Sequence, residues 1–522
     1  MPAADLQSFV AELEQRGWLK RIAVEVDPAL EITEIADRVT KAGGPALLFE
    51  RVRDSAMPLL INTFGTQERT CLALGCGGFD EVAARVKDLL KPEIPTTFLQ
   101  KLKKLPELAQ LGSLPPKIVK RGICQEVVHI DDADLFTLPA LKCWPLDGDA
   151  TAAVHRPPSQ GGLEGGEGQR APQPVTLPRP LPGREGSVGR YITLGAVFTK
   201  NPDTGDRNVG MYRVQLFEPK LAAMHWHMHH DGARHFRLYR ARGRRMPLAI
   251  ALGGPAVLPY VATCPLPPGI DECLFAGFLQ GQPLELVPGV TQPEIEVPAT
   301  AEIVIEGYID PAEDLILEGP FGDHTGFYSL ADYYPRFHVT AITHRQRPLY
   351  PATIVGKPPQ EDFWLGKATE RIFLPVVQMI VPDVLDYDLP TFGCFHNCAF
   401  VKIRKEYPYQ ARRVMHALWG AGQMALTKII IVVDADVDVH NPDDVLFHVG
   451  ANVDPQRDIE FVRGPVDILD HAAPVCGAGS KMGIDATRKL PGEGTVRAWP
   501  AELEMTPEVK ALVTRRWGEY GL

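Results

Sequence analysis

The chain has 522 residues, of which 45% are hydrophobic and 23% are charged, and its formal net charge is −11 at pH 7. At roughly 100–200 residues per domain, this composition predicts a globular protein of several domains with real cores. The negative balance, with no basic stripe among its Lys and Arg residues, argues against a nucleic-acid-binding protein.

The expected location is the cytoplasm. No stretch approaches the roughly 20 consecutive apolar residues that cross a bilayer, and residues 1–13 lack the basic start and the cleavage site of a signal peptide. Nine cysteines, an odd and sparse number for this length, suit free thiols in a reducing compartment rather than a disulfide framework.

Residues 1–115 predict a small α/β domain. A first helix has one apolar face and ends before Gly17; the face comprises Leu6, Phe9, Val10 and Leu13. Further elements follow in chain order: a helix over 32–41, a buried strand over 46–49 and a third helix over 79–90.

Residues 116–340 predict a strand-rich domain. β-branched or alternating apolar residues bounded by Gly and Pro indicate its strands, over 190–199, 210–217, 248–252 and 301–309. Between 149 and 189 the chain is rich in Pro and Gly and poor in residues that a core could bury. We therefore expect a loosely ordered insertion within this domain.

Residues 341–522 return to an α/β pattern. A helical pattern over 411–421 is followed by a continuous apolar strand over 427–433. This order predicts a parallel sheet covered by helices, a unit suited to oligomerisation.

Two carboxylates lie five residues apart in a loop rich in Gly and Pro. Glu318 and Asp323 flank the sequence GPFG, which fixes the backbone between them. In one pocket, repulsion and burial would raise the pKa of one acid enough for proton transfer near neutral pH. The structural alternative is a Gly-Pro turn with solvated acids.

A second candidate is RNVGMYR at 207–213. The Arg213 guanidinium is a natural clamp for a substrate carboxylate, and a structural pair with a neighbouring acid is the alternative. In a regular strand Asn208 and Arg213 would face opposite sides, unless Gly210 bends or bulges the chain.

Five of the fifteen histidines lie between 225 and 235: His225, His227, His229, His230 and His235. Alternation would place 225, 227 and 229 on one face of a strand. Together with Asn208 and Glu272 as oxygen ligands, such a face invites a divalent metal, although zinc-type spacing is absent. Chance enrichment around one structural histidine is the alternative.

Three other motifs are weaker. Cys394 and Cys398 resemble half of a zinc knuckle, but they have no partner pair at usable spacing and are expected to be buried thiols. The acids at 434–438 mimic the start of an EF-hand, and GAGSK at 477–481 lacks the order of a phosphate-binding loop.

Taken together, the motifs resemble the UbiD family of prenylated-FMN decarboxylases over nearly the whole chain outside the insertion. The closest similarity is to the 4-hydroxy-3-polyprenylbenzoate and menaquinone-pathway branch. The matching segments, in order, are RNVGMYR at 207–213, MHW at 224–226 leading to HHDGA at 229–233, ECLFAG at 272–277, EGPFGDHTG at 318–326, GCFHN at 393–397 and GSKMGIDAT at 479–487.

The resemblance implies a cofactor site. Asn208, His229 and Glu272 would hold a Mn²⁺-like metal together with the phosphate of prenylated FMN, with His230 as the competing histidine ligand. The remaining contacts to the cofactor would come from the same segments: Val209, Met211, Tyr212, Arg213 and His230. Hard oxygen ligands favour such a metal over zinc. A nearby monovalent cation such as K⁺ is typical of the family.

The resemblance also implies a catalytic set of Arg213, Glu318 and Asp323. Arg213 would orient the substrate carboxylate, and an acid would protonate the carbon that loses CO2 while the flavin acts as electron sink in a covalent adduct. Asp323 stands where the cinnamic-acid branch has a glutamate. This difference fits the hydroxyaryl branch and leaves open whether a cycloadduct or a single-bond adduct forms.

The implied fold is α/β: an N-terminal α/β domain, a split β-barrel that binds the flavin, and a C-terminal α/β domain with a terminal helix that builds dimers or hexamers. The implied reaction is decarboxylation of a 4-hydroxybenzoate-type acid in ubiquinone or menaquinone biosynthesis. A flavin prenyltransferase would supply the cofactor, and a prenylated substrate would require an apolar channel or peripheral membrane contact. Other phenolic, naphthoic or heteroaromatic acids, an FMN-dependent reductase and a non-catalytic assembly subunit are the alternatives.

Overall fold

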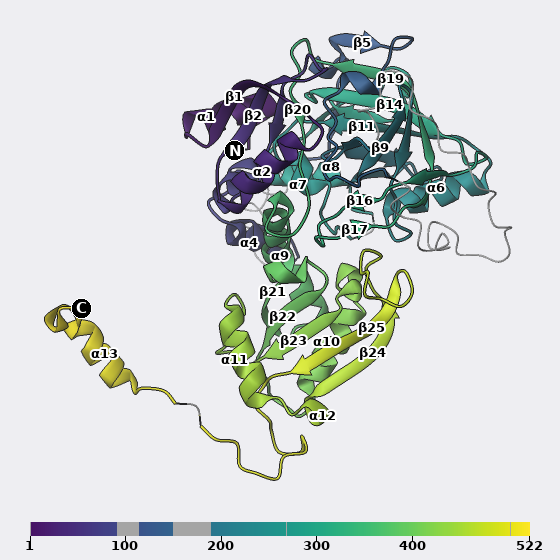
Figure 1. The fold of residues 1–522 in the computed structure, drawn as a ribbon. Helices are drawn as coiled ribbons and strands as arrows, with labels where there is room; N and C mark the ends of the chain where they lie inside the picture. Colours follow the sequence, from purple (N-terminus) through teal and green to yellow (C-terminus); the bar gives the residue numbers. More distant parts are fainter. Residues whose placement is uncertain (1, 91–113, 150–188, 268, 502) are drawn as a thin grey trace, which may run out of the picture.

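The computed structural model describes residues 2–90, 114–149, 189–267, 269–501 and 503–522. Three units, each built on a β-sheet, follow one another along the chain. The long helix α9 (Glu361–Ile380) joins the upper two units to the lower one (Figure 1). The predicted insertion over 149–189 falls almost wholly outside the described residues. This mixed architecture confirms the expected α/β fold.

The N-terminal unit follows the predicted order. Its first helix ends before Gly17, whose φ of 71° is in the left-handed region, and all four apolar residues predicted for its face are buried. Its elements are α1 (Leu6–Gln15), β1 (Leu19–Val26), α2 (Glu31–Lys41), β2 (Ala46–Val52), β3 (Leu59–Ile61), α3 (Gln67–Leu74) and α4 (Phe79–Leu90). A strand from much later in the chain, β20 (Tyr350–Pro351), pairs with β3 and completes this sheet.

The central unit is built on one large curled sheet. Its strands are β5 (Val127–His129), β6 (Tyr191–Ile192), β7 (Ala196–Lys200), β8 (Arg207–Met211), β9 (Val214–Glu218), β10 (Leu221–Met224), β11 (Met246–Leu252), β14 (Ile303–Ile309) and β19 (Arg336–His344). They pair in the order β6-β9-β10-β19-β14-β11-β7-β8, with β5 beside β19. Because β8 and β9 lie near opposite ends of this order yet only two residues apart in the chain, the sheet must curl. This is the expected split barrel.

Two predicted strands are each interrupted. The strand predicted over 190–199 is β6 and β7, and the strand predicted over 210–217 is the end of β8 followed by β9. The interruptions fall where the chain passes between the two ends of the curled sheet. The strands predicted over 248–252 and 301–309 are confirmed as β11 and β14.

Helices and short strands cover the barrel. The helices are α6 (Asp231–Ala241), α7 (Leu258–Val261) and α8 (Glu272–Gln280). The short strands are β4 (Lys117–Ile118), β12 (Glu285–Pro288), β13 (Glu296–Pro298), β15 (Ile316–Glu318), β16 (Phe321–Gly322), β17 (Tyr328–Ser329) and β18 (Asp332–Tyr334).

The C-terminal unit has a five-stranded sheet in the order β21-β22-β23-β25-β24. The inner pairs are parallel, as predicted, and the two edge pairs are antiparallel. The strands are β21 (Val384–Asp388), β22 (Cys398–Ile403), β23 (Ile429–Val433), β24 (Ile459–Pro465) and β25 (Ala478–Asp485). The helices are α9 (Glu361–Ile380), α10 (Gln410–Trp419), α11 (Pro442–Asn452), α12 (Pro455–Asp458) and α13 (Pro507–Arg516).

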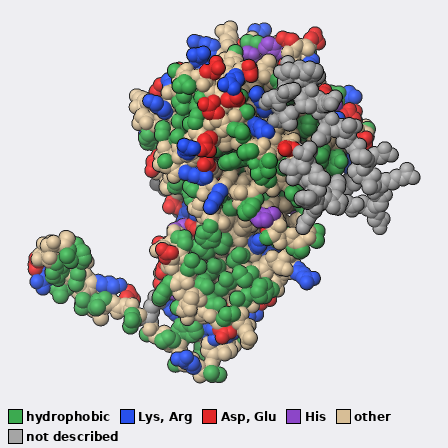
Figure 2. All heavy atoms as spheres, in the orientation of Figure 1, with side chains coloured by type: hydrophobic (Ala, Val, Ile, Leu, Met, Phe, Trp, Pro, Cys, Tyr) green, Lys and Arg blue, Asp and Glu red, His purple; other side chains and the backbone are tan. Residues whose placement is uncertain are grey.

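The terminal helix α13 lies apart from the rest of the molecule (Figure 1). None of its side chains is buried against the described residues. Figure 2 also shows hydrophobic side chains gathered on one face of the C-terminal unit. Exposed apolar residues in this unit include Met379, Phe392, Leu446, Phe447 and Phe461.

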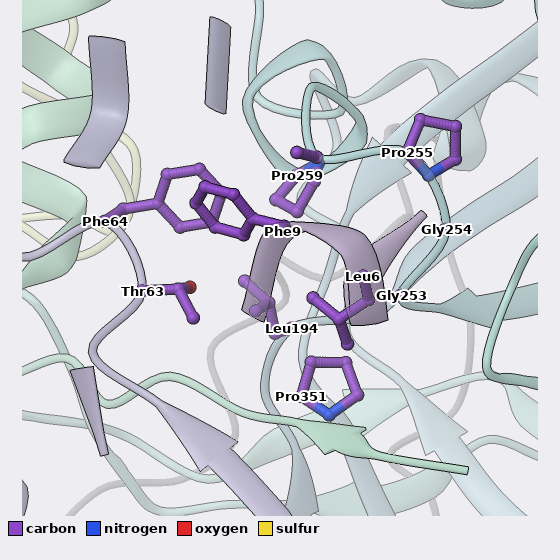
Figure 3. A pocket seen from close by; sticks show the side chains of 11 residues that line it. Leu6, Phe9, Thr63, Phe64, Leu194, Gly253, Gly254, Pro255, Pro259 and Pro351 are labelled. Carbon is purple, nitrogen blue, oxygen red and sulfur yellow. The ribbon is translucent and has the colours of Figure 1, made fainter. Parts of the chain in front are cut away.

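The N-terminal and central units share their cores. Phe9 and Leu13 of α1 belong to the same buried cluster as Phe198 of β7 and Val304 of β14. A small apolar cavity remains where α1 approaches Gly253 and Pro255 (Figure 3). Its volume of about 20 Å³ has room for about one water molecule. Within the described part of the chain, every helix is too short or too polar to cross a bilayer.

Candidate active site

Arg213 joins the two predicted acids at the split in the barrel. Its Nε and Nη2 donate to Glu318 Oε1 and Oε2 at 2.8 and 3.0 Å, and its Nη1 donates to Asp323 Oδ2 at 2.6 Å. All three side chains are buried, and the guanidinium also lies 4.6 Å from the centre of the Phe321 ring. The structure therefore brings the predicted catalytic set together.

The strand order explains this position. Tyr212 and Arg213 are the only two residues between β8 and β9, so Arg213 leaves one end of the sheet as the chain crosses to the other. The regular alternation that would have separated Asn208 from Arg213 stops at Met211, and both side chains are buried. The interruption therefore begins after Met211, beyond the Gly210 at which a bend was considered from the sequence.

Glu318 is ionised, and its hydrogen bonds fix its position. Burial alone would raise its pKa, but the charges and hydrogen bonds of Arg213 and His225 lower it to about 2. His225 Nδ1 lies 2.9 Å from Glu318 Oε2, and since the carboxylate can only accept, the Nδ1–H must donate. Next to it, the Gly319 N–H donates to Gln215 of β9 at 2.8 Å, which fixes the loop to the barrel.

Asp323 has a different second partner. Its Oδ1 accepts from the backbone N–H and from Nδ1 of His324, at 2.9 and 3.0 Å. Burial raises the pKa of Asp323, but His324 and Arg213 together hold it well below its ordinary value. The same hydrogen bond raises the pKa of His324 to about 9 against the effect of burial, so this imidazole is charged at neutral pH.

Asp147 supports the loop that carries Glu318 and Asp323. This role was not predicted from the sequence. Its carboxylate accepts from the backbone N–H groups of Gly322 at 2.8 Å, Trp144 at 2.8 Å and Cys143 at 3.0 Å. Burial raises its pKa to about 7, with these donors opposing the rise. A lone acid next to an insertion carries no sequence signal for this role.

Residues of the predicted cofactor site converge on β8, α6 and α8. The Val209 N–H donates to Glu272 Oε2 at 3.0 Å, and the Met211 N–H donates to the Ala262 carbonyl at 2.9 Å. Buried Asn208 and Tyr212 interact through their side chains, and the Tyr212 ring lies 5.0 Å from the His230 ring. Burial raises the pKa of Glu272 to about 7.

The histidine cluster is a loop, not a strand, so the predicted alternation is wrong. β10 ends at Met224 and α6 begins at Asp231, because the chain must turn from the sheet into the covering helix. His225 and His227 contact through their Nε2 atoms at 2.8 Å, and the His227 N–H donates to His230 Nδ1 at 3.1 Å. His229 is exposed.

His235 is also separate from this loop, because it lies in α6 and contacts Thr199 through Nδ1 at 2.9 Å. The five histidines therefore divide between a loop beside Glu318 and a helix.

These residues fit a phosphate with a divalent metal. The first turn of α6 follows His230, whose side chain makes no capping bond with the described residues, so its N–H groups can meet an anion. Buried Trp226 Nε1, in the same loop, has no hydrogen-bond partner among the described residues. An amide oxygen, a carboxylate and an imidazole are suitable ligands for Mn²⁺.

Among the residues that the structure describes, none of the weaker motifs gathers a group of potential metal ligands. Cys394 and Cys398 are buried free thiols, as expected, and the nine cysteines, all described, are unpaired by disulfides. One atom from each of Glu370, Asp388 and His440 lies within 4.8 Å of the others, a spacing that a metal could use. There the Lys367 ammonium contacts both carboxylates, and Arg371 pairs with Asp386 beside them. We therefore interpret the group as ion pairs joining α9 to the sheet.

Comparison with known proteins gives the family. Three profiles of the 3-octaprenyl-4-hydroxybenzoate carboxy-lyase family match in succession: its N-terminal domain at 10–88, its Rift-related domain at 180–358 and its C-terminal domain at 363–486. The chain belongs to the UbiD family. It is a carboxy-lyase of the aromatic-acid decarboxylase class.

Relatives and solved structures agree. An uncharacterized protein of Aquifex aeolicus is 47% identical over 520 residues, covering 99% of both chains. Vanillic acid decarboxylase of Sedimentibacter hydroxybenzoicus in closed form has a TM-score of 0.80 at 25% identity, covering 100% of this chain and 99% of that one. An evolved dimeric form of the UbiD-class enzyme HmfF from Pelotomaculum thermopropionicum, in complex with prFMN, has a TM-score of 0.70 at 26% identity, covering 97% and 98%.

Proposed function

We propose that this carboxy-lyase removes CO2 from an aromatic acid of the 4-hydroxybenzoate type, with prenylated FMN as cofactor, in ubiquinone or menaquinone biosynthesis. The observation that carries the proposal is the buried Arg213 held between Glu318 and Asp323. The family description, a 3-octaprenyl-4-hydroxybenzoate carboxy-lyase, supports the substrate class and the pathway. The similarity to a vanillic acid decarboxylase supports a phenolic acid.

The cofactor would bind along β8, between α6 and α8. Asn208, His229 and Glu272 would hold a Mn²⁺-like metal against its phosphate, with Tyr212 and the start of α6 beside it. The similarity to HmfF, which was solved with prFMN, supports the cofactor. The predicted K⁺ would bind beside this metal.

Arg213 would act first, by binding the carboxylate of the substrate. A guanidinium makes paired hydrogen bonds to a carboxylate, and burial strengthens them. The bound prenylated flavin supplies an electron sink for the electrons left when CO2 departs. Because the substrate brings a third negative charge to Arg213, it would weaken the hold on Glu318 or Asp323 and raise the pKa of that acid.

The second step is protonation. The carbon that loses CO2 needs one proton, and Asp323 or Glu318 would deliver it. His225 and His324 each donate an N–H hydrogen bond to one of these carboxylates, so the orientation of each acid is fixed. Asp323, shorter by one methylene than glutamate, leaves more room for a ring with a hydroxyl group.

We propose that the protein works as a homo-oligomer in the cytoplasm. The exposed face of the C-terminal unit and α13, whose Leu512 and neighbouring Trp517 are 43% and 53% exposed, offer apolar surface for a second copy. A flavin prenyltransferase would supply the cofactor, and a substrate with a prenyl chain would require contact with a membrane surface.

Mass spectrometry of the cofactor tests the proposal. Protein produced together with a flavin prenyltransferase is expected to release prenylated FMN rather than FMN, and to release CO2 from hydroxyaryl acids. An ordinary FMN-dependent reductase would instead carry FMN that NAD(P)H bleaches, and Glu318→Gln would leave its activity unchanged.

A further inference from the structure

His324 connects the active-site loop to the C-terminal unit. One side of its ring donates to Asp323, and its Nε2 lies 3.4 Å from Nε2 of His396. His396 lies in the turn between β21 and β22, and its ring meets His324 edge to face at 5.1 Å. Two imidazoles, those of His324 and His396, therefore connect Asp323 to the C-terminal unit.

The two imidazoles differ in protonation state. Asp323 raises the pKa of His324 to about 9, whereas burial lowers the pKa of His396 to about 4. At neutral pH a charged N–H therefore faces a neutral ring nitrogen, as a hydrogen bond requires. The other groups that face the pair are Asp362 from α9 and two acids of the segment after β24, Asp467 and Asp470.

The turn that carries His396 is strained. Cys394 and Phe395 have φ angles of 44° and 67°, in the left-handed region that residues other than glycine avoid. The Phe395 ring packs onto α9 at Gly366, where a Cβ atom would lie 2.3 Å from the ring. Strained backbone persists where surrounding packing enforces it, and it concentrates at functional sites.

The active-site loop and the C-terminal unit also touch at a second place. The ring of Phe327, in the loop that follows His324, lies 4.1 Å from the ring of His471. This ring contact joins the same loop to the same unit without a hydrogen bond to the Asp323 carboxylate. It provides a matched control for the His324–His396 pair.

We propose that His396 is a positioning residue for Asp323: through His324 it fixes the direction of that acid, and it does so from the C-terminal unit. The position of the C-terminal unit then decides whether Asp323 is correctly placed. The inference rests on the proposed function for its effect on turnover, and on geometry alone for its effect on the loop.

Turnover tests the first part. In holoenzyme, His396→Leu is expected to lower kcat for CO2 release on the order of 10- to 100-fold, because small misplacements of a reacting group are costly. The flavin content should stay at the wild-type level, and the alkaline limb of the pH profile should move to lower pH, since His324 loses the acceptor for its charged N–H. His471→Leu should change kcat less than about threefold.

Hydrogen–deuterium exchange of the cofactor-free protein tests the second part without any substrate. The Asp323 N–H donates to Phe327 at 3.0 Å and the Gly326 N–H to Asp323 at 2.9 Å, so both amides report on the loop. They should exchange faster in His396→Leu, and less so in His471→Leu.

The proposal is overturned if exchange and kcat are unchanged in His396→Leu, or if both variants lower kcat equally. A wild-type protein that releases no CO2 would defeat the proposed function instead, and the exchange result alone would then decide the role of His396.

Discussion

Arg213 and Glu318 form a paired, two-point contact in which Nε and Nη2 each donate to a different carboxylate oxygen, at 2.8 and 3.0 Å. Neither side chain has appreciable access to water, at 7% and 0% exposure. A buried pair of this kind is costly to break, because either partner alone would leave an uncompensated charge. Its presence at the split of the barrel is the basis of the functional proposal.

Gly322 precedes Asp323 and is closely packed. A Cβ atom at this position would lie 2.1 Å from Cδ1 of Trp144. Gly322→Ala should therefore displace Trp144 or the loop, and lower kcat on the order of 10- to 100-fold together with Tm. Thermal melts and CO2 release measure both. Gly78→Ala, where the Cβ would meet open space, should leave both near the wild-type values; equal effects in the two variants would contradict the account.

The stability of the fold should depend on Glu318 in acid. Its pKa in the folded protein is about 2, below the ordinary 4.5. A lowered carboxyl pKa stabilises the folded state above the unfolded value, and this contribution is lost as the pH falls from about 4.5 towards 2. Glu318→Gln should therefore show a smaller fall of Tm between about pH 5 and 3 than the wild type. Exposed Glu285→Gln is the control, and parallel curves for Glu318→Gln and the wild type would refute the prediction.

The metal ligand among the histidines is expected to be His229. His230 Nδ1 already accepts the His227 N–H, and its ring stacks on His227 at 4.7 Å, whereas His229 is exposed. His229→Ala and Glu272→Gln should each lose bound manganese, measured by elemental mass spectrometry, and His230→Ala should retain more of it. The reverse order of the two histidine variants would assign the ligand to His230.

Removal of α13 should change the assembly state. The helix has no buried residue among those described, and its apolar side chains offer a contact surface for a second copy. Deletion of residues 507–522 is expected to lower the molar mass measured by light scattering while the Tm of each subunit stays within a few degrees. An unchanged molar mass would show that α13 is not an assembly element.

Local patterns predicted the outer parts of the fold well. The face of α1, the bounds of α4 and the strand β23 follow from apolar periodicity, which depends only on neighbours along the chain. The loop from Glu318 to Asp323 was also recognisable, because Gly, Pro and paired acids stand together in the sequence. Its meeting with Arg213 was expected from the family resemblance, and no local pattern marks the strand order that brings them together.

Long-range contacts account for what the sequence did not predict. His225 to His229 alternate as in a strand, yet the chain turns there because α6 must cover the barrel. Asp147 contacts Gly322 across 175 residues, and His324 contacts His396 across 72. Such partners depend on how distant segments pack, and no local pattern marks them.

The most direct test of the central claim is CO2 release from a panel of hydroxyaryl acids by holoenzyme and by Arg213→Lys. A lysine ammonium cannot reproduce the paired contact of a guanidinium. The account predicts release from at least one acid by the wild type and a loss on the order of 10²–10³-fold in Arg213→Lys, with release expressed per bound flavin in both proteins. Arg245→Lys, at an exposed ion pair, should match the wild type. Equal release by the wild type and Arg213→Lys would contradict the claim that Arg213 holds the substrate for decarboxylation.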